Sequence, residues 1–132
     1  LFAQSLAKKW LGGGQLFASD LHQFSPEGKS GMHSIQAVRR LIEEVNLAPF
    51  SAGKKAFIID DAERMLPTSA NALLKTLEEP PKNTLIILVT SAPERLLATI
   101  VSRSQTVRFC PLSEPEVEQV LTSKLAVSAD QA

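Results

Sequence analysis

Hydrophobic residues recur along the chain with two different spacings, one typical of helices and one typical of buried strands. Over residues 1–11, Phe2, Leu6 and Trp10 recur at the four-residue spacing of one helical face, and a run of glycines ends the pattern. Ser34 can cap a second helix, because an apolar stripe of helical spacing follows it directly. The pattern therefore predicts a helix at both places.

Two short segments are apolar without interruption, which is typical of parallel strands buried on both faces. Residues 56–59 form the first segment and residues 85–89 form the second. Weaker alternation predicts two further strands, a short one over residues 20–24 and another over residues 105–109.

A helix is predicted between the two apolar segments. We expect it to open at Thr68 or Ser69 and to end before Pro80, because proline supplies no backbone donor. A shorter helix follows around residues 96–101. Strands that alternate with helices indicate parallel βαβ units and an α/β fold.

A last helix is predicted after Pro111. Ser113 and Glu116 have the spacing of a capping box, and an apolar stripe follows them. A helix after a proline break, with no later element to pack against, predicts that residues 1–111 form one domain and that residues 112–132 begin a second. The chain starts without Met inside a predicted helix, so we expect its N-terminus to be cut.

Composition excludes several classes of function. The 132 residues include 14 Lys and Arg against 14 Asp and Glu, so the formal net charge is zero. This argues against a free-standing protein that grips many phosphates of a nucleic acid, and any DNA contact is expected to be local or shared. A single cysteine, Cys110, fits a cytoplasmic, reducing compartment. No apolar run approaches the roughly twenty residues of a membrane span.

Polar residues follow both apolar segments. Asp60 and Asp61 come after the first, and Thr90 and Ser91 come after the second. Functional groups gather at the carboxyl ends of parallel strands. A strand that ends in acidic residues is typical of a magnesium–nucleotide site, where one carboxylate holds the water shell of the metal and the other orients an attacking water. Two acids can equally mark the solvent-exposed end of a strand, and the residues alone leave both interpretations open.

Two other patterns do not predict sites. The sequence Gly-Lys-Ser at residues 28–30 looks like the tail of a phosphate-binding loop, but Gln23 stands where that loop needs its first glycine. We therefore predict an ordinary turn there. His22, His33 and the distant Cys110 lack metal-ligand spacing, so both histidines are predicted to be structural or solvated.

Residues 69–81, SANALLKTLEEPP, resemble the signature helix of bacterial clamp-loader subunits of the AAA+ superfamily. The surrounding order is also similar, with a Walker B-like strand at residues 57–63 and a sensor strand at residues 88–91. Ser-Arg-Ser at residues 102–104 stands where the family usually has Ser-Arg-Cys, and residues 93–99 look closer to the delta-prime type of DNA polymerase III subunit than to the gamma/tau type.

The resemblance implies an AAA+ P-loop NTPase-type parallel sheet with flanking helices, lacking its first strand, followed by the first helix of a lid domain. It also implies roles for individual residues. Asp60 matches the Walker B aspartate associated with magnesium, and Asp61 falls where active members carry a catalytic glutamate that is one methylene longer. Thr90 and Ser91 match the sensor-1 region, which reports on the γ-phosphate.

Arg103 matches the arginine finger that such a subunit presents to a nucleotide on its neighbour. The fixed charge and planar fork of arginine suit this role, because they can stabilise charge spread over phosphate oxygens. The alternative for Arg103 is a surface salt bridge.

Two features of the family are missing from the sequence. The Walker A loop would lie before Leu1, so this chain has no phosphate cradle and is expected to hold no cofactor itself. ATP and magnesium are then expected in the full-length protein or on a neighbouring subunit. The four-cysteine zinc module that often precedes the strand near Asp20 is also absent, so no metal is predicted.

The resemblance implies a part in ATP-dependent loading of a sliding clamp at primed DNA, with weak ATPase activity or none in this subunit. The implied partners are gamma/tau and delta subunits, the clamp and primed DNA, without a membrane. Two alternatives remain. One is an active gamma/tau-type ATPase, and the other, more remote, is a receiver-like phospho-acceptor domain, since Asp60 and Asp61 follow one strand and Thr90 or Ser91 another.

Overall fold

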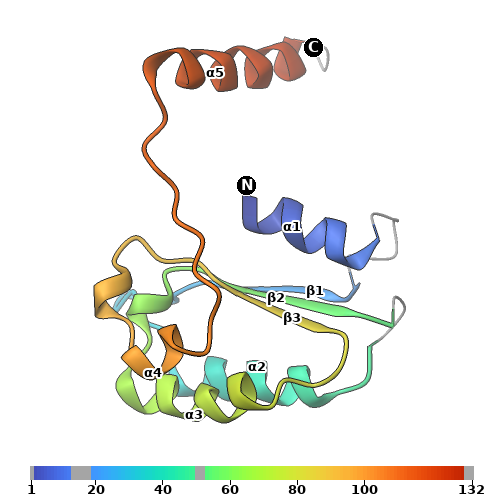
Figure 1. Cartoon of the computed structure of the whole chain (residues 1–132), viewed down its shortest axis with the longest axis vertical. Coiled ribbons are helices and arrows are strands. Elements are labelled where there is room, and N and C mark those ends of the chain that lie inside the picture. Colours follow the sequence, from blue (N-terminus) through green and yellow to red (C-terminus); the bar gives the residue numbers. More distant parts are fainter. Residues whose placement is uncertain (1, 13–18, 50–52, 130–132) are drawn as a thin grey trace.

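A computed structural model describes residues 2–12, 19–49 and 53–129 of the chain. Its elements are α1 (Phe2–Leu11), β1 (Leu21–Phe24), α2 (Ile35–Asn46), β2 (Lys55–Ile59), η2 (Ala62–Arg64), α3 (Pro67–Glu78), β3 (Thr84–Leu88), η3 (Pro93–Arg95), α4 (Ala98–Val101) and α5 (Glu114–Ala129). Figure 1 shows α1 over one face of a small sheet and α2 and α3 over the other. The α/β fold class predicted from the sequence is confirmed.

The sheet has three strands in the order β1-β2-β3, and all neighbours run parallel. The central strand β2 is buried at every position. Its side chains alternate between two cores. Phe57 and Ile59 face the core built with α2 and α3, whereas Ala56 and Ile58 face the core under α1. This confirms the prediction for residues 56–59. The second apolar segment also forms a strand, β3, but β3 lies at the edge of the sheet and is only half-buried at every position, so its predicted burial on both faces was wrong.

The starts of α2 and α3 are determined by different residues. Ser34 caps α2 as predicted, because its Oγ accepts a hydrogen bond of 3.1 Å from the backbone N–H of Ala37. α3 begins at Pro67, so the predicted start at Thr68 or Ser69 was wrong by one or two residues. Proline is favoured at the first helical position, because its fixed φ suits the helix and its missing N–H has no partner there.

Helix α1 packs on the sheet through its smaller residues. Ala7 and Leu11 are buried against β2. Phe2, Leu6 and Trp10, the row that indicated the helix, are 53%, 39% and 36% exposed. The helix was therefore predicted correctly, but the row with the largest side chains does not form its buried face.

The predicted strand over residues 105–109 is wrong. This segment forms no strand, and Val107 and Phe109 are 59% and 67% exposed. An alternating pattern forms a strand only when a neighbouring strand completes its backbone hydrogen bonds and one face is buried. The Phe109 ring instead contacts the Phe2 ring edge to face, with 4.8 Å between the ring centroids.

Helix α5 lies apart from the sheet at the end of an extended segment (Figure 1). The predicted pairing at its start is confirmed, because Glu116 Oε2 accepts hydrogen bonds of 2.7 Å from both the backbone N–H and the hydroxyl of Ser113. Every residue from 101 to 123 is exposed. The division into domains at residues 1–111 and 112–132 stays a prediction.

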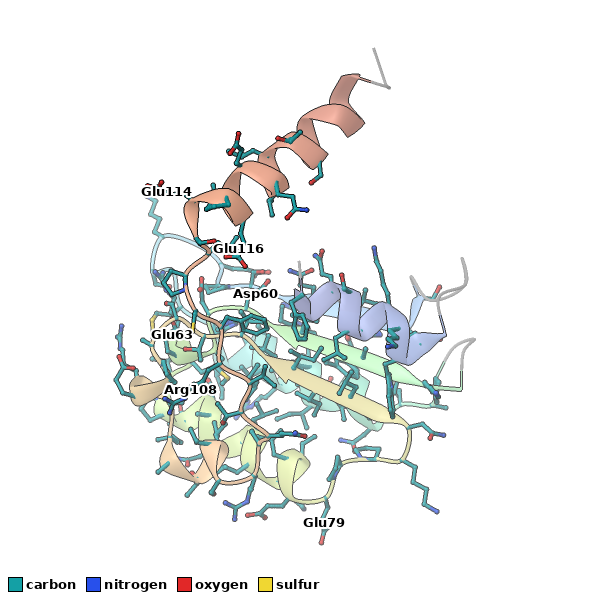
Figure 2. The ribbon with its side chains drawn as sticks, turned by 45° about the horizontal axis from the view of Figure 1, so that its top comes forward. Asp60, Glu63, Glu79, Arg108, Glu114 and Glu116 are labelled. Carbon is teal, nitrogen blue, oxygen red and sulfur yellow. The ribbon has the colours of Figure 1, made fainter. Side chains whose placement is uncertain are left out.

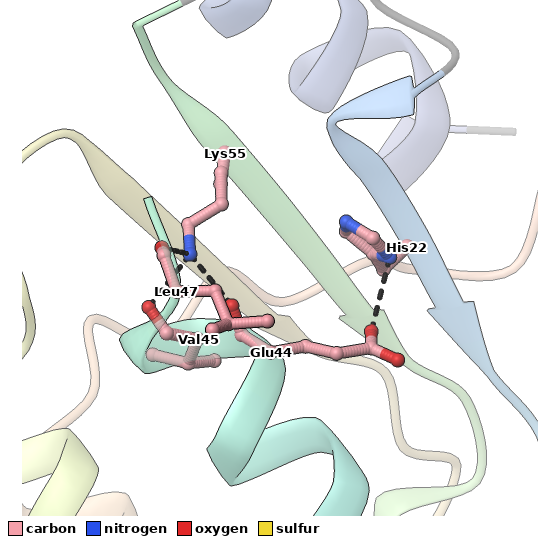
Figure 3. A network of polar contacts seen from close by, with 5 residues as sticks. All are labelled: His22, Glu44, Val45, Leu47 and Lys55. Atoms are coloured by element: carbon pink, nitrogen blue, oxygen red, sulfur yellow. Dashed lines mark hydrogen bonds and ion pairs between the residues drawn. The ribbon is translucent and has the colours of Figure 1, made fainter. Parts of the chain in front are cut away.

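A buried lysine joins the start of β2 to the end of α2 (Figure 3). Lys55 is 4% exposed, and its Nζ donates hydrogen bonds to the carbonyl groups of Glu44 at 2.6 Å, Val45 at 2.8 Å and Leu47. Burial lowers the pKa of Lys55 below its ordinary value, although the carboxylates of Asp20 and Glu44 act to raise it. Lys55 therefore supplies a donor to carbonyl groups at the end of a helix, where the Glu44 carbonyl also accepts from the N–H of Leu47 at 3.3 Å.

We expect Lys55→Met to lower the free energy of unfolding by about 1 to 3 kcal/mol, because the buried Val45 carbonyl would lose the lysine donor and those of Glu44 and Leu47 would lose one of theirs. Urea unfolding followed by circular dichroism measures the change. Lys54→Met is the matched control, since Lys54 Nζ makes one bond of 3.3 Å to the Trp10 carbonyl and is only partly buried. Equal losses in the two variants would contradict a special role of Lys55.

Candidate functional site

Backbone hydrogen bonds align the carboxyl ends of the three strands. Phe24, Ile59 and Leu88 are in register. Beyond the strands, the N–H of Asp60 bonds the Phe24 carbonyl at 2.8 Å, and the N–H of Ala62 bonds the Val89 carbonyl at 2.9 Å. The structure therefore brings the segments after β1, β2 and β3 to one edge, where Figure 2 shows Asp60 and Glu63. Four predicted residues lie on these segments, namely Asp60, Asp61, Thr90 and Ser91.

The Asp60 carboxylate is held by side chains from β1 and the residues after it. Its Oδ2 accepts a hydrogen bond of 2.5 Å from Gln23 Nε2 and one of 3.1 Å from Ser25 Oγ. Gln4 on α1 extends this chain of contacts, because its Nε2 donates to Gln23 Oε1 at 3.1 Å. Asp60 is thus bonded within the fold, and the contacts lead back to α1.

The backbone of Asp60 is fixed by a buried histidine. His33 is 2% exposed, and its Nε2 lies 2.7 Å from the Asp60 carbonyl oxygen. A carbonyl oxygen can only accept, so this nitrogen carries the hydrogen. His22 is half-buried, its Nδ1 is 3.1 Å from Glu44 Oε2 and its ring stacks on Phe57. Both histidines therefore have structural contacts, as predicted.

Asp61 differs from Asp60 in its backbone. Its φ of 46° and ψ of 51° place it in the left-handed region, and its side chain is exposed. Aspartate is among the few residues other than glycine that adopt this conformation readily. The turn at Asp61 leads directly into η2, so the two acidic residues do not form a pair that shares the same partners.

Thr90 and Ser91 are tied to the segment after β2 through Glu63. Ser91 Oγ donates to Glu63 Oε1 at 3.0 Å, and Thr90 Oγ1 accepts from the N–H of Ala92 at 3.1 Å. Burial acts to raise the pKa of the Glu63 carboxyl, but hydrogen bonds with Thr90 and Ser91 outweigh it and hold that pKa below its ordinary value. Glu63 was not predicted as a site residue.

Arg103 lies just beyond α4 and contacts a different part of the fold. Its Nη2 is 2.5 Å from Glu78 Oε1 at the end of α3, and its Nη1 donates to the Thr99 carbonyl at 2.9 Å. None of these partners contacts Asp60 among the described hydrogen bonds. The structure therefore does not bring Arg103 together with the acidic edge of its own sheet.

Residues 28–31, possible metal ligands and possible membrane spans are the remaining features that the sequence analysis considered. Residues 28–31 form the predicted turn, and Glu27 and Met32 pair across it. In the described ranges, no group of three or more His, Cys, Asp or Glu side chains is arranged to hold a metal ion. Over the same residues, no helix has both the length and the apolar character needed to cross a bilayer.

A family model described as "DNA polymerase III, delta subunit" matches residues 15–113. The chain belongs to this family. DNA polymerase III subunit delta' of Bacillus subtilis (strain 168) is 42% identical over 102 residues, which are 77% of this chain and 30% of the relative. The corresponding subunit of Escherichia coli (strain K12) is 37% identical over 111 residues, 84% of this chain and 33% of the relative. These relatives confirm a clamp-loader subunit of the delta-prime type.

A solved structure shares the fold. The DNA polymerase III gamma subunit-related protein of Thermotoga maritima MSB8 is 38% identical and superimposes with a TM-score of 0.65, over 74% of this chain and 32% of that chain. The AAA+-type parallel sheet predicted for this family member is thereby confirmed. The chain spans about a third of the length of these two delta' relatives.

Proposed function

We propose that this delta-prime-type chain acts in the bacterial DNA polymerase III clamp loader and takes part in ATP-dependent loading of the sliding clamp at primed DNA. The observation that carries the proposal is the match of the family over residues 15–113. Its partners are then gamma/tau and delta subunits, and it meets the clamp and DNA through the complex. A formal net charge of zero fits DNA contact that is shared with other subunits.

In this proposal, the subunit contributes Arg103 to ATP hydrolysis, and Arg103 acts on a nucleotide that a neighbouring subunit binds. Arg103 is partly exposed and lies away from the partners of Asp60, which supports a role in trans. A guanidinium at a subunit boundary can stabilise the charge that develops on the phosphate oxygens during transfer. The other side of the boundary supplies the bound nucleotide.

Asp60 and Asp61 do not by themselves indicate ATP hydrolysis by this subunit. Asp60 has the oxygen donors that suit a hydrated magnesium ion. However, one of its oxygens already accepts from Gln23 and Ser25. Asp61 is shorter than the glutamate expected of an active member. Neither aspartate therefore supports ATP hydrolysis by this subunit.

The second candidate is an active gamma/tau-type motor subunit. DNA polymerase III subunit tau of Bacillus subtilis (strain 168) is 36% identical over 91 residues, which are 69% of this chain and 16% of the relative, and the Thermotoga maritima protein is gamma-related. ATP hydrolysis by the isolated full-length subunit separates the two candidates. If the subunit is a motor, it should hydrolyse ATP about as fast as a gamma/tau subunit assayed in parallel. If it is of the delta-prime type, it should hydrolyse little ATP or none.

Reconstitution tests the proposal itself. The full-length subunit is mixed with gamma/tau and delta subunits, and assembly is followed by size-exclusion chromatography with light scattering. We expect one complex that contains the subunit, and clamp loading on primed DNA that falls to background when the subunit is omitted. A complex that assembles and loads the clamp equally well without it would contradict the proposal.

A further inference from the structure

The guanidinium of Arg103 is held by two kinds of partner. The Thr99 carbonyl accepts from Nη1 at 2.9 Å, and Ser102 Oγ lies 3.5 Å from the same nitrogen. Glu78 Oε1 lies 2.5 Å from the other terminal nitrogen, Nη2. Neutral groups of the α4 segment therefore fix one end of the guanidinium, and a carboxylate from α3 neutralises its charge at the other end.

The carboxylate of Glu78 stands at an unusual position in its helix. Glu78 is the last residue of α3, where the helix dipole opposes a negative charge. The ion pair with Arg103 compensates for this. Because Glu78 comes from another helix, it can separate from Arg103 while the Thr99 contact within the α4 segment remains.

The ion pair is also weak enough to exchange. The side chains of Arg103 and Glu78 are 35% and 48% exposed. Exposed ion pairs shift an equilibrium by no more than about fivefold, which corresponds to about 1 kcal/mol. A phosphate group is an anion that a guanidinium binds through the same terminal nitrogens, so phosphate and the Glu78 carboxylate compete for Nη2.

We propose that Glu78 is the resting counter-ion of Arg103, which holds the guanidinium at the end of α3 until a phosphate group on a neighbouring subunit displaces the carboxylate. This inference rests on the proposed role of Arg103 as an arginine finger. Glu78 is then a positioning residue that restrains the finger before the nucleotide site is assembled. A purely structural alternative is that the pair only fastens the α4 segment to α3.

The test uses the full-length subunit in the reconstituted complex and compares Glu78→Gln with Glu79→Gln. Glu79, which Figure 2 labels, is the matched control, because it is the neighbouring carboxylate and is exposed. Among the ion pairs of the described residues, Arg103 is paired with Glu78 and not with Glu79. Two quantities are measured, the affinity for a fluorescent non-hydrolysable ATP analogue without DNA, and ATP hydrolysis with and without primed DNA and clamp.

We expect Glu78→Gln to tighten binding of the analogue about two- to fivefold and to raise DNA-independent hydrolysis by a similar factor. Hydrolysis stimulated by DNA should stay within twofold of wild type, and Glu79→Gln should match wild type throughout. Weaker binding by Glu78→Gln would overturn the proposal, and so would equal behaviour of the two variants. Glu78→Asp, which keeps the charge on a shorter side chain, should fall between wild type and Glu78→Gln.

A variant at Arg103 separates this proposal from the proposed function. Arg103→Ala and the double variant with Glu78→Gln are expected to behave alike, because the counter-ion has nothing left to restrain. Wild-type hydrolysis by Arg103→Ala would refute the finger role. Reduced hydrolysis by Arg103→Ala, together with no effect of Glu78→Gln, would refute only the counter-ion. Thermal unfolding of each variant checks that the subunit is folded.

Discussion

Arg103→Ala is expected to reduce hydrolysis at the one nucleotide site that it completes by about a thousandfold or more, since arginine fingers contribute factors of this size. The measurement is phosphate release by the reconstituted complex with primed DNA and clamp at saturating ATP. The substitution changes this subunit alone, so nucleotide sites that Arg103 does not complete are unaffected. The total steady-state rate of ATP hydrolysis therefore falls only by the fraction that this site contributes. The loss of rate at the site itself is measured from phosphate release in the first turnover.

Two variants control this experiment. Arg108→Ala removes another exposed arginine, which lies on the extended segment before α5 (Figure 2), and should leave hydrolysis unchanged. Arg103→Lys keeps the charge but loses the planar fork, so it should recover only part of the rate. The finger role is refuted when Arg103→Ala hydrolyses ATP as fast as Arg108→Ala.

Phe57→Ala should cost about 3 to 5 kcal/mol of unfolding free energy, the largest loss of stability that we expect from a single substitution in this chain. Phe57 lies at the centre of the sheet, is 0% exposed and belongs to the core shared by α2 and α3. Its removal leaves a cavity and also takes away the ring on which His22 stacks. Urea unfolding followed by circular dichroism gives the loss.

Phe2→Ala is the control for this substitution. Phe2 is 53% exposed and contacts only the edge of another exposed ring among the aromatic pairs described here, that of Phe109. Its truncation should cost less than about 1.5 kcal/mol, the usual value of an aromatic pair. A similar loss from both truncations would mean that β2 is not the centre of the stable core.

The fold could be predicted from the sequence wherever a pattern reflects burial directly. The uninterrupted apolar run of β2 indicated a strand covered on both sides, and Ser34 indicated the start of α2. The hydrophobic pattern gave wrong predictions where the structure of a segment depends on a neighbouring element. Residues 105–109 alternate like a strand, yet alternation does not say whether a neighbouring strand is present. The helical spacing in α1 likewise did not show that Ala7 would face the sheet.

The candidate site was predictable as far as topology determines it. Parallel strands bring their carboxyl ends to one edge, so Asp60 and Ser91 could be expected near one another. Gln23 and Glu63 were missed, because a polar residue beside a strand end has no distinctive spacing. The position of Gln23, at the carboxyl end of β1, is the one signal that could have indicated it. Pairing of Arg103 with Glu78 depends on how α4 packs on α3, which no local pattern records.

The exposed stretch over residues 101–123 has a practical consequence for handling the isolated chain. It carries several large apolar side chains, among them Phe109, Leu112 and Leu121, which are 67%, 56% and 55% exposed. Molecules normally stay apart in solution partly because like net charges repel, and here the formal net charge is zero. Self-association of the isolated chain should therefore increase with protein concentration. It competes with assembly unless partner subunits are present from the start.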